Sequence, residues 1–163
     1  MKPTLPFGQL PYIEHGDVKM AQGWGCFRYA AKIGGLTGDN DAEYALSEML
    51  TEEAVDLYNI MNKANYAEDK VASYAKAIEE MKPQLAYLEK LLPGGDSPFF
   101  KSGDKRLAGG IAIACSLDIA VLLLPEIAAW MPANTPKLNA FLVAMQGSVL
   151  APYSDMNIYF TRA

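Results

Sequence analysis

The stretch that decides the fold is Pro6-Phe7-Gly8-Gln9-Leu10-Pro11-Tyr12-Ile13-Glu14, followed by Gly16-Asp17-Val18-Lys19-Met20-Ala21-Gln22. Apolar and polar residues alternate on both sides of a turn over residues 14–17, which predicts a β-hairpin over residues 5–20. Gly16 supplies the positive φ that this turn needs. Pro11 cannot donate to the ladder, so it marks an edge, a bulge or a cis peptide bond.

Helical patterning follows the hairpin and continues to the end of the chain. A helix is expected over residues 22–33, ended by Gly34 and Gly35, with a linker over residues 36–40. Apolar residues then recur at helical spacing over residues 41–66 and 68–92, where Pro83 should kink the second helix. A last helix is expected over residues 136–149. The patterning predicts an α+β fold, predominantly α: a small domain of residues 1–36, then an all-α domain of residues 41–163 with four or five helices.

The most apolar segment is 107–131, and a membrane span has to be weighed there. Its first eighteen residues contain one charge, Asp118, which is costly at mid-bilayer, and Pro125 follows at once. A helix buried on all sides explains the run better, so we expect no membrane span. Asp118 is then either a perturbed acid or, as we favour, a carboxylate bonded to backbone or a hydroxyl.

Composition excludes several classes of function. The 163 residues are 51% hydrophobic and 20% charged, the range of a folded protein, and the net charge of −5 argues against a nucleic-acid partner. There is one histidine and no Cys/His spacing typical of a metal site. Cys26 and Cys115 are expected to be small buried hydrophobes, and a cytoplasmic or other reducing compartment follows.

The opening stretch is similar to the glutathione transferase family, nearest its sigma-like cytosolic branch, where an F-G-Q-x-P segment forms the third strand of a thioredoxin-like domain. The resemblance extends through Cys26-Phe27-Arg28-Tyr29-Ala30-Ala31 and reaches Glu48-Met49-Leu50, Val55-Asp56-Leu57 and Pro136-Lys137-Leu138. It implies a partial thioredoxin-like N-terminal domain followed by the family's all-α C-terminal domain.

The resemblance also implies a glutathione site. Pro11 would be cis, and the backbone of Leu10 would pair with the cysteinyl part of glutathione. Gln22 would contact the γ-glutamyl end, next to Gly23, and Asp56 would reach the glutathione of a partner subunit. The ordinary alternatives are a polar residue in a first helical turn for Gln22 and a solvated charge for Asp56.

Three departures from the family pattern bear on function. The family's catalytic Tyr, Ser or Cys lies in a βαβ unit, and nothing before Leu5 can supply it. The family has Gln-Ser where this chain has Gln22-Gly23, which removes a hydroxyl from the γ-glutamyl contact. A Ser/Thr-x-x-Asp capping box is replaced by Leu107 and Gly110, at a cost of about 1 kcal/mol.

We therefore expect an N-terminally truncated transferase fold that acts as a non-catalytic binding or scaffold subunit. A protein partner or a homodimer would cover the open edge of strand 7–13. The partner could be a larger assembly, a homodimer could have a rearranged N-terminus, or the sequence could start at an internal Met of a longer chain. The alternative function is a glutathione-binding transferase or isomerase with residual or partner-completed activity, and a third is storage of an apolar ligand.

A few aromatic and polar residues have two readings. Trp24, Phe27 and Tyr29 are expected to pack a domain interface rather than line a pocket. Tyr58 or Met61 could line an electrophile pocket, although core or dimer packing is the interpretation we favour. His15, at the hairpin tip, should be exposed and without a role.

Overall fold

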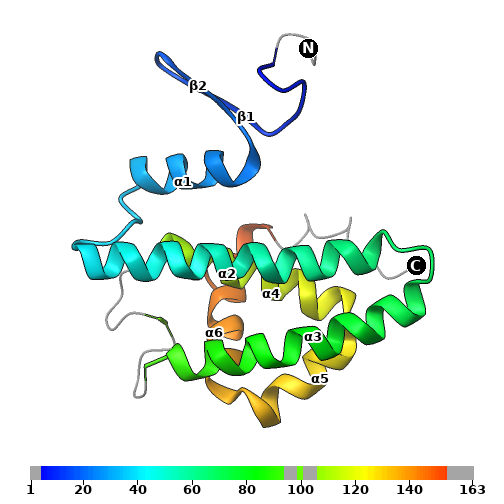
Figure 1. Ribbon diagram of the computed structural model, residues 1–163. Coiled ribbons are helices and arrows are strands. Elements are labelled where there is room, and N and C mark those ends of the chain that lie inside the picture. Colours follow the sequence, from blue (N-terminus) through cyan, green and yellow to red (C-terminus); the bar gives the residue numbers. More distant parts are fainter. Residues whose placement is uncertain (1–4, 94–98, 101–105, 154–163) are drawn as a thin grey trace.

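A computed structural model describes residues 5–93, 99–100 and 106–153 of the chain (Figure 1). It confirms an α+β fold, predominantly α. The elements in chain order are β1 (Tyr12–His15), β2 (Val18–Ala21), α1 (Gly23–Ile33), α2 (Asp41–Asn65), α3 (Lys70–Leu91), α4 (Ala108–Leu123), α5 (Pro125–Asn134) and α6 (Pro136–Gln146). Figure 1 shows the hairpin and α1 above α2, with α4 behind α2 and α3 and α5 below it. We call β1, β2 and α1 the hairpin–helix unit, and α2 to α6 the bundle.

The hairpin is antiparallel, with Tyr12 opposite Ala21 and His15 opposite Val18. Its turn is tighter than expected, because residues 14 and 15 belong to β1 and only residues 16 and 17 connect the strands. Gly16 has the predicted positive φ, at 57°. The Leu10–Pro11 peptide bond is cis, as the family resemblance implied.

The bundle is built around α4, which packs mainly against α2. Leu50 and Leu57 of α2 and Ile113 and Leu117 of α4 are fully buried in its core. The two helices approach closely at Gly109, where a Cβ atom would stand 2.1 Å from the carbonyl oxygen of Ser47. Only glycine permits this approach, because that contact is with main chain rather than with a movable side chain.

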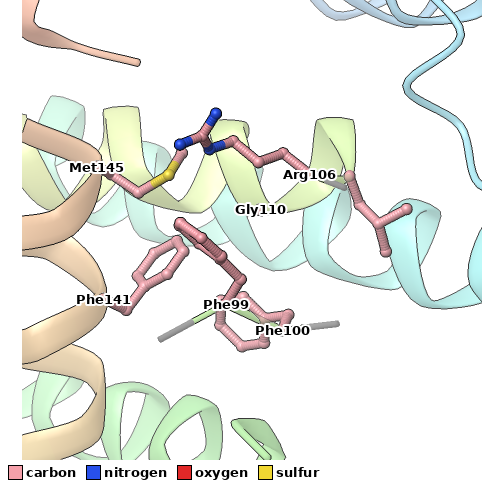
Figure 2. Close-up of a pocket in the computed structure, with 7 residues that line it drawn as sticks. Phe99, Phe100, Arg106, Gly110, Phe141 and Met145 are labelled. Carbon is pink, nitrogen blue, oxygen red and sulfur yellow. The ribbon is translucent and has the colours of Figure 1, made fainter. Parts of the chain in front are cut away.

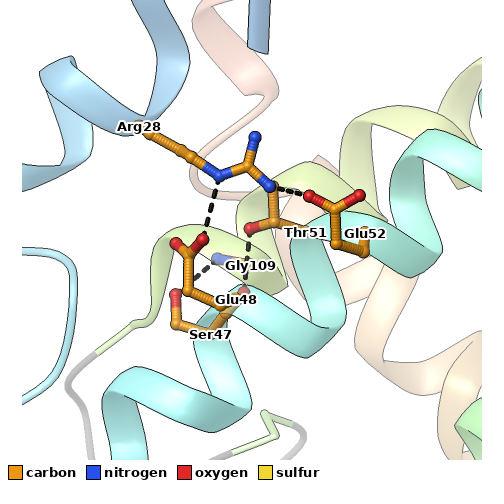
Figure 3. Close-up of polar contacts among 6 residues, drawn as sticks. All are labelled: Arg28, Ser47, Glu48, Thr51, Glu52 and Gly109. Atoms are coloured by element: carbon orange, nitrogen blue, oxygen red, sulfur yellow. Dashed lines mark hydrogen bonds and ion pairs between the residues drawn. The ribbon is translucent and has the colours of Figure 1, made fainter. Parts of the chain in front are cut away.

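The N-terminus of α4 lacks a cap of its own, as predicted, since Leu107 offers no side-chain hydrogen bond. The expected loss is nevertheless offset by other parts of the chain. The Ala108 N–H donates to the Leu36 carbonyl at 2.8 Å, and the Gly109 N–H donates to the Ser47 hydroxyl at 3.0 Å (Figure 3). The linker and α2 thus satisfy two of the N–H groups that a helix start leaves open.

The apolar segment forms two helices, not one. Among the described residues no single helix has the length and apolarity to cross a membrane; α4 and α5 meet that test only as a pair, bent by 120° at Leu124. Asp118 accepts a hydrogen bond from the Gln146 side chain at 2.7 Å. The prediction of a bonded carboxylate is correct in that respect, with the Gln146 amide as a donor, but Asp118 is half-buried rather than buried.

Two other expectations need correction. The last helix ends at Gln146 rather than residue 149, because Gly147 caps it. Cys26 is buried as expected, but Cys115 is exposed, because it lies on a side of α4 that its neighbours leave uncovered. Tyr159 and Phe160 of the expected aromatic tail lie outside the described residues.

Candidate glutathione site

The turn at Gln22 is the most unusual piece of backbone in the described chain. Gln22 has φ 80° and ψ 120°, and it is the only residue other than glycine with positive φ among those described. It lies between the end of β2 and the start of α1, where it has no side-chain capping bond. Strained backbone of this kind persists only where surrounding structure holds it, and such positions cluster at functional sites.

The start of α1 presents main-chain donors. The first hydrogen bond of the helix joins the Cys26 N–H to the Gln22 carbonyl oxygen at 2.8 Å. The N–H groups of residues 23–25 precede it and have no acceptor within the helix. Together with the positive end of the helix dipole, they suit a carboxylate.

The cis-proline turn lies beside this helix start. A Cβ atom on Gly23 would stand 3.7 Å from Cγ of Pro11, an ordinary contact. Leu10, just before Pro11, is 69% exposed, so its backbone is open to a ligand. Four of the five predicted site residues, Leu10, Pro11, Gln22 and Gly23, therefore meet at one place.

Asp56 lies apart from them, on α2, with an exposed side chain. Its charge bears on Glu53, one turn earlier: burial, and then the Asp56 carboxylate, raise the pKa of Glu53. One carboxylate oxygen of Glu53 is buried and has no hydrogen-bond partner. This burial could not be predicted, because the spacing of two acids on a helix does not reveal how deeply either is buried.

The contacts of Cys26 were not predicted, since we expected only a small buried hydrophobe there. Its thiol donates toward the Met20 carbonyl oxygen, 3.5 Å away, and lies 4.0 Å from that of Pro11. Its position could have indicated these contacts. Cys26 lies one helical turn after Gln22, where a small side chain faces the strands.

Arg28 and Trp24 attach the hairpin–helix unit to the bundle. The Arg28 guanidinium pairs with Glu48, at 2.9 Å, and with Glu52 (Figure 3). The Trp24 ring meets the Tyr58 ring edge-on at a centroid distance of 6.4 Å. Trp24 and Phe27 both pack on the bundle core, as expected for an interface.

Three of the other expectations have mixed outcomes. Met61 is 2% exposed and belongs to the core, so it lines no open pocket. The expectation for Tyr29 is wrong, because it lines an open cleft between α1 and the start of α2, and its hydroxyl bonds His15 Nδ1 at 2.9 Å. His15 is exposed as predicted, but this bond means that it is not without contacts.

Two hollows lie near these elements. A cleft of about 520 Å³ opens between α1 and the start of α2, lined by Met20, Gly25, Arg28, Tyr29, Lys32, Thr37, Tyr44 and Glu48. A second, apolar cavity lies between Arg106, Phe99 and Phe141 (Figure 2), where the guanidinium stands 5.0 Å over the Phe99 ring. Its interior offers about 10 Å³, roughly the space of one water, which does not support storage of an apolar ligand there. Among the described residues, no three His, Cys, Asp or Glu side chains are grouped to hold a metal ion.

Known proteins resemble this chain in both sequence and fold. It is 33% identical over 155 residues to glutathione S-transferase P of Caenorhabditis elegans, covering 87% of this chain and 73% of the relative. It is 29% identical over 152 residues to hematopoietic prostaglandin D synthase of Gallus gallus, covering 80% and 75%. The solved Pi-class glutathione S-transferase of Onchocerca volvulus superposes with a TM-score of 0.80 at 26% identity, over 95% of this chain and 74% of that one. No family model matches the chain.

The fold and the arrangement around the cis-proline turn define a two-part protein: part of a thioredoxin-like domain and an all-helical domain. The chain belongs to the glutathione S-transferase family. The sigma-like branch stays a prediction, since the relatives carry Pi-class names as well.

Proposed function

We propose that this chain binds glutathione at the junction of the cis-proline turn and the start of α1. The observation that carries the proposal is the strained backbone of Gln22, at φ 80° immediately before open helix N–H groups. The names of the relatives support glutathione as the ligand.

Each predicted residue has a role in this proposal. The γ-glutamyl carboxylate lies at the start of α1, against Gln22 and the backbone of Gly23. The cysteinyl part pairs with the main chain of Leu10, before cis Pro11. Asp56, which is exposed on α2, reaches the glutathione of a second subunit, since the family commonly forms homodimers. The linker at residues 36–40 separates the two domains, residues 1–36 and 41–163.

We propose binding, rather than conjugation, as the role of this chain. Activation of the glutathione thiol needs a hydroxyl free to donate to it. Both hydroxyls of the hairpin–helix unit, residues 12–33, have partners: Tyr12 donates to Glu14 at 3.0 Å, and Tyr29 bonds His15. Partial burial, and then Glu14, raise the pKa of Tyr12, which makes it a weaker donor to a thiolate. The competing proposal is a transferase or isomerase whose activity a partner completes.

A scaffold role has its own supporting observation. Within the described residues β1 pairs only with β2, so its other edge is open. The expected strand 7–13 is shorter at its start, since β1 begins at Tyr12. Phe7 and Leu10, which precede β1 in the chain, are 63% and 69% exposed. An open edge with apolar neighbours is a template for another strand, and we propose a protein partner or a second copy of the chain there.

The cysteines bear on the compartment in which the chain acts. Cys26 and Cys115 are both free thiols, which suits a reducing compartment.

Titration calorimetry with glutathione tests the binding proposal. Saturable binding at millimolar affinity or tighter, abolished by Gln22→Ala and retained by Asn59→Ala on α2, supports it. The absence of binding heat up to several millimolar glutathione would contradict the binding proposal. Turnover of a generic electrophile above background, lost in Asp56→Ala, would favour the transferase instead.

Light scattering tests the scaffold role separately. A dimer or higher assembly that dissociates in Phe7→Glu supports the open edge as an interaction surface. A monodisperse monomer at all concentrations, with no partner recovered by pull-down, contradicts it.

A further inference from the structure

Cys26 contacts the main chain on both sides of the proposed glutathione site. Its side chain is 5% exposed, and its sulfur lies 3.5 Å from the Met20 carbonyl oxygen and 4.0 Å from that of Pro11. Its N–H donates to the Gln22 carbonyl oxygen at 2.8 Å. One small residue thus joins the cis-proline turn, the end of β2 and the strained turn.

These contacts matter because the Gln22 turn is unfavourable by itself. A backbone at φ 80° needs neighbours that leave it no alternative. Among the described residues no side chain caps α1 at this point. The Gln22 carbonyl accepts the Cys26 N–H, and the Cys26 thiol holds the Met20 carbonyl, two residues before Gln22. The thiol has one proton, which serves the nearer carbonyl of Met20, while the sulfur fills the space against Pro11.

We propose that Cys26 is a positioning residue of the glutathione site, and the inference rests on the proposed function above. Cys26 fixes the Gln22 turn relative to the cis-proline turn. The open N–H groups of α1 then face the γ-glutamyl carboxylate at the same time as the backbone of Leu10 faces the cysteinyl part.

The proposal separates ligands that span both turns from ligands that contact one of them. Loss of the thiol, which lies between the Met20 and Pro11 carbonyls, should uncouple the Gln22 turn from the cis-proline turn. A ligand that contacts both turns is then weakened, and a ligand that contacts only the cis-proline side is not. S-methylglutathione and S-methylcysteinylglycine differ in the γ-glutamyl group, and neither carries a free thiol. A residue that only stabilised the fold would affect both ligands alike.

The test is calorimetry of both ligands with the wild-type chain, Cys26→Ala and Cys26→Ser. Cys26→Ala should weaken S-methylglutathione roughly 2- to 5-fold, the size expected for a weak S–H hydrogen bond, and leave S-methylcysteinylglycine unchanged. Cys26→Ser keeps a donor and should recover most of the affinity. Cys115→Ala, the matched control at the exposed cysteine, should bind both ligands like the wild type.

Alkylation by N-ethylmaleimide, followed by mass spectrometry, gives a second readout. Saturating S-methylglutathione should slow the modification of Cys26 and leave the rate at Cys115 unchanged. Equal weakening of both ligands in Cys26→Ala, or unchanged affinity in a variant with wild-type circular dichroism, overturns the positioning role alone. If the wild-type chain binds no S-methylglutathione, the proposed function fails, and this inference fails with it.

Discussion

The bundle and the hairpin–helix unit are held together in different ways. In the bundle, α2 and α4 bury whole side chains such as Leu57 and Ile113, and they approach closely enough to exclude a Cβ at Gly109. In the unit, two strands of four residues pack on one helix, which buries only Cys26 and Ala31, each still 5% exposed. The bundle therefore carries most of the apolar burial that stabilises the chain.

The difference explains where a site can be placed. Close packing leaves little freedom to adjust a side chain in the bundle. In the part of the chain that the structure describes, the unit instead has a β1 edge without a partner strand, a cis-proline turn and a strained Gln22, which leave main-chain groups available to a ligand. It depends on α2 for its place, through Arg28 and Trp24.

The largest effect should come from the close approach in the bundle. Gly109→Ala would put its Cβ 2.1 Å from a main-chain oxygen, and we expect a loss of about 3 kcal/mol or more in the free energy of unfolding. Gly110→Ala is the matched control, because its Cβ meets only Phe100, at 3.9 Å, and it should stabilise the helix by about 0.5–1 kcal/mol. Urea unfolding measures both, and equal stability of the two variants would show that α2 and α4 are not so closely packed.

A gain is expected in the site. Gly23→Ser would place a hydroxyl at the start of α1 with its Cβ at ordinary contact from Pro11. A hydrogen bond to the γ-glutamyl carboxylate should tighten glutathione binding roughly 10-fold. Gly25→Ser, in the same turn, has similar room but lines the cleft beside α2, and it should give no gain. If calorimetry finds the same glutathione affinity for both variants, the γ-glutamyl carboxylate does not bind next to Gly23.

The smallest effect concerns the attachment of the two regions. Arg28→Met removes ion pairs that are a third or more exposed, so we expect a loss of only about 0.5–1 kcal/mol, reduced further by salt. Hydrogen exchange should quicken in α1 while the amides of α4 keep their protection. Lys82→Met, whose partner Glu79 lies on the same helix, is the control and should leave α1 unchanged. Equal quickening in both regions would mean that they unfold as one.

Periodicity predicted the local elements well and the tertiary contacts poorly. The alternation around Gly16 predicted the hairpin, and helical spacing predicted α2 within one residue. The break between α4 and α5 was not predicted, because an apolar run has no periodicity that marks a bend. Pro125 argues against a membrane span, but it is also the first residue of α5. The resemblance suggested five residues for the proposed site, of which Leu10, Pro11, Gln22 and Gly23 lie together and Asp56 lies apart on α2. The contacts of Cys26 depend on two segments brought together by folding, which spacing along the chain does not show.

The start of α4 has an evolutionary consequence. Ser47, 62 residues away in the chain, accepts the hydrogen bond that a capping residue at position 107 would accept in a helix with its own box. Either Ser47 or a capping residue at position 107 can accept the hydrogen bond from the Gly109 N–H. The effect of a substitution at Ser47 therefore depends on which residue occupies position 107. Such epistasis lets a lineage lose the local cap without penalty, and afterwards makes Ser47 difficult to replace.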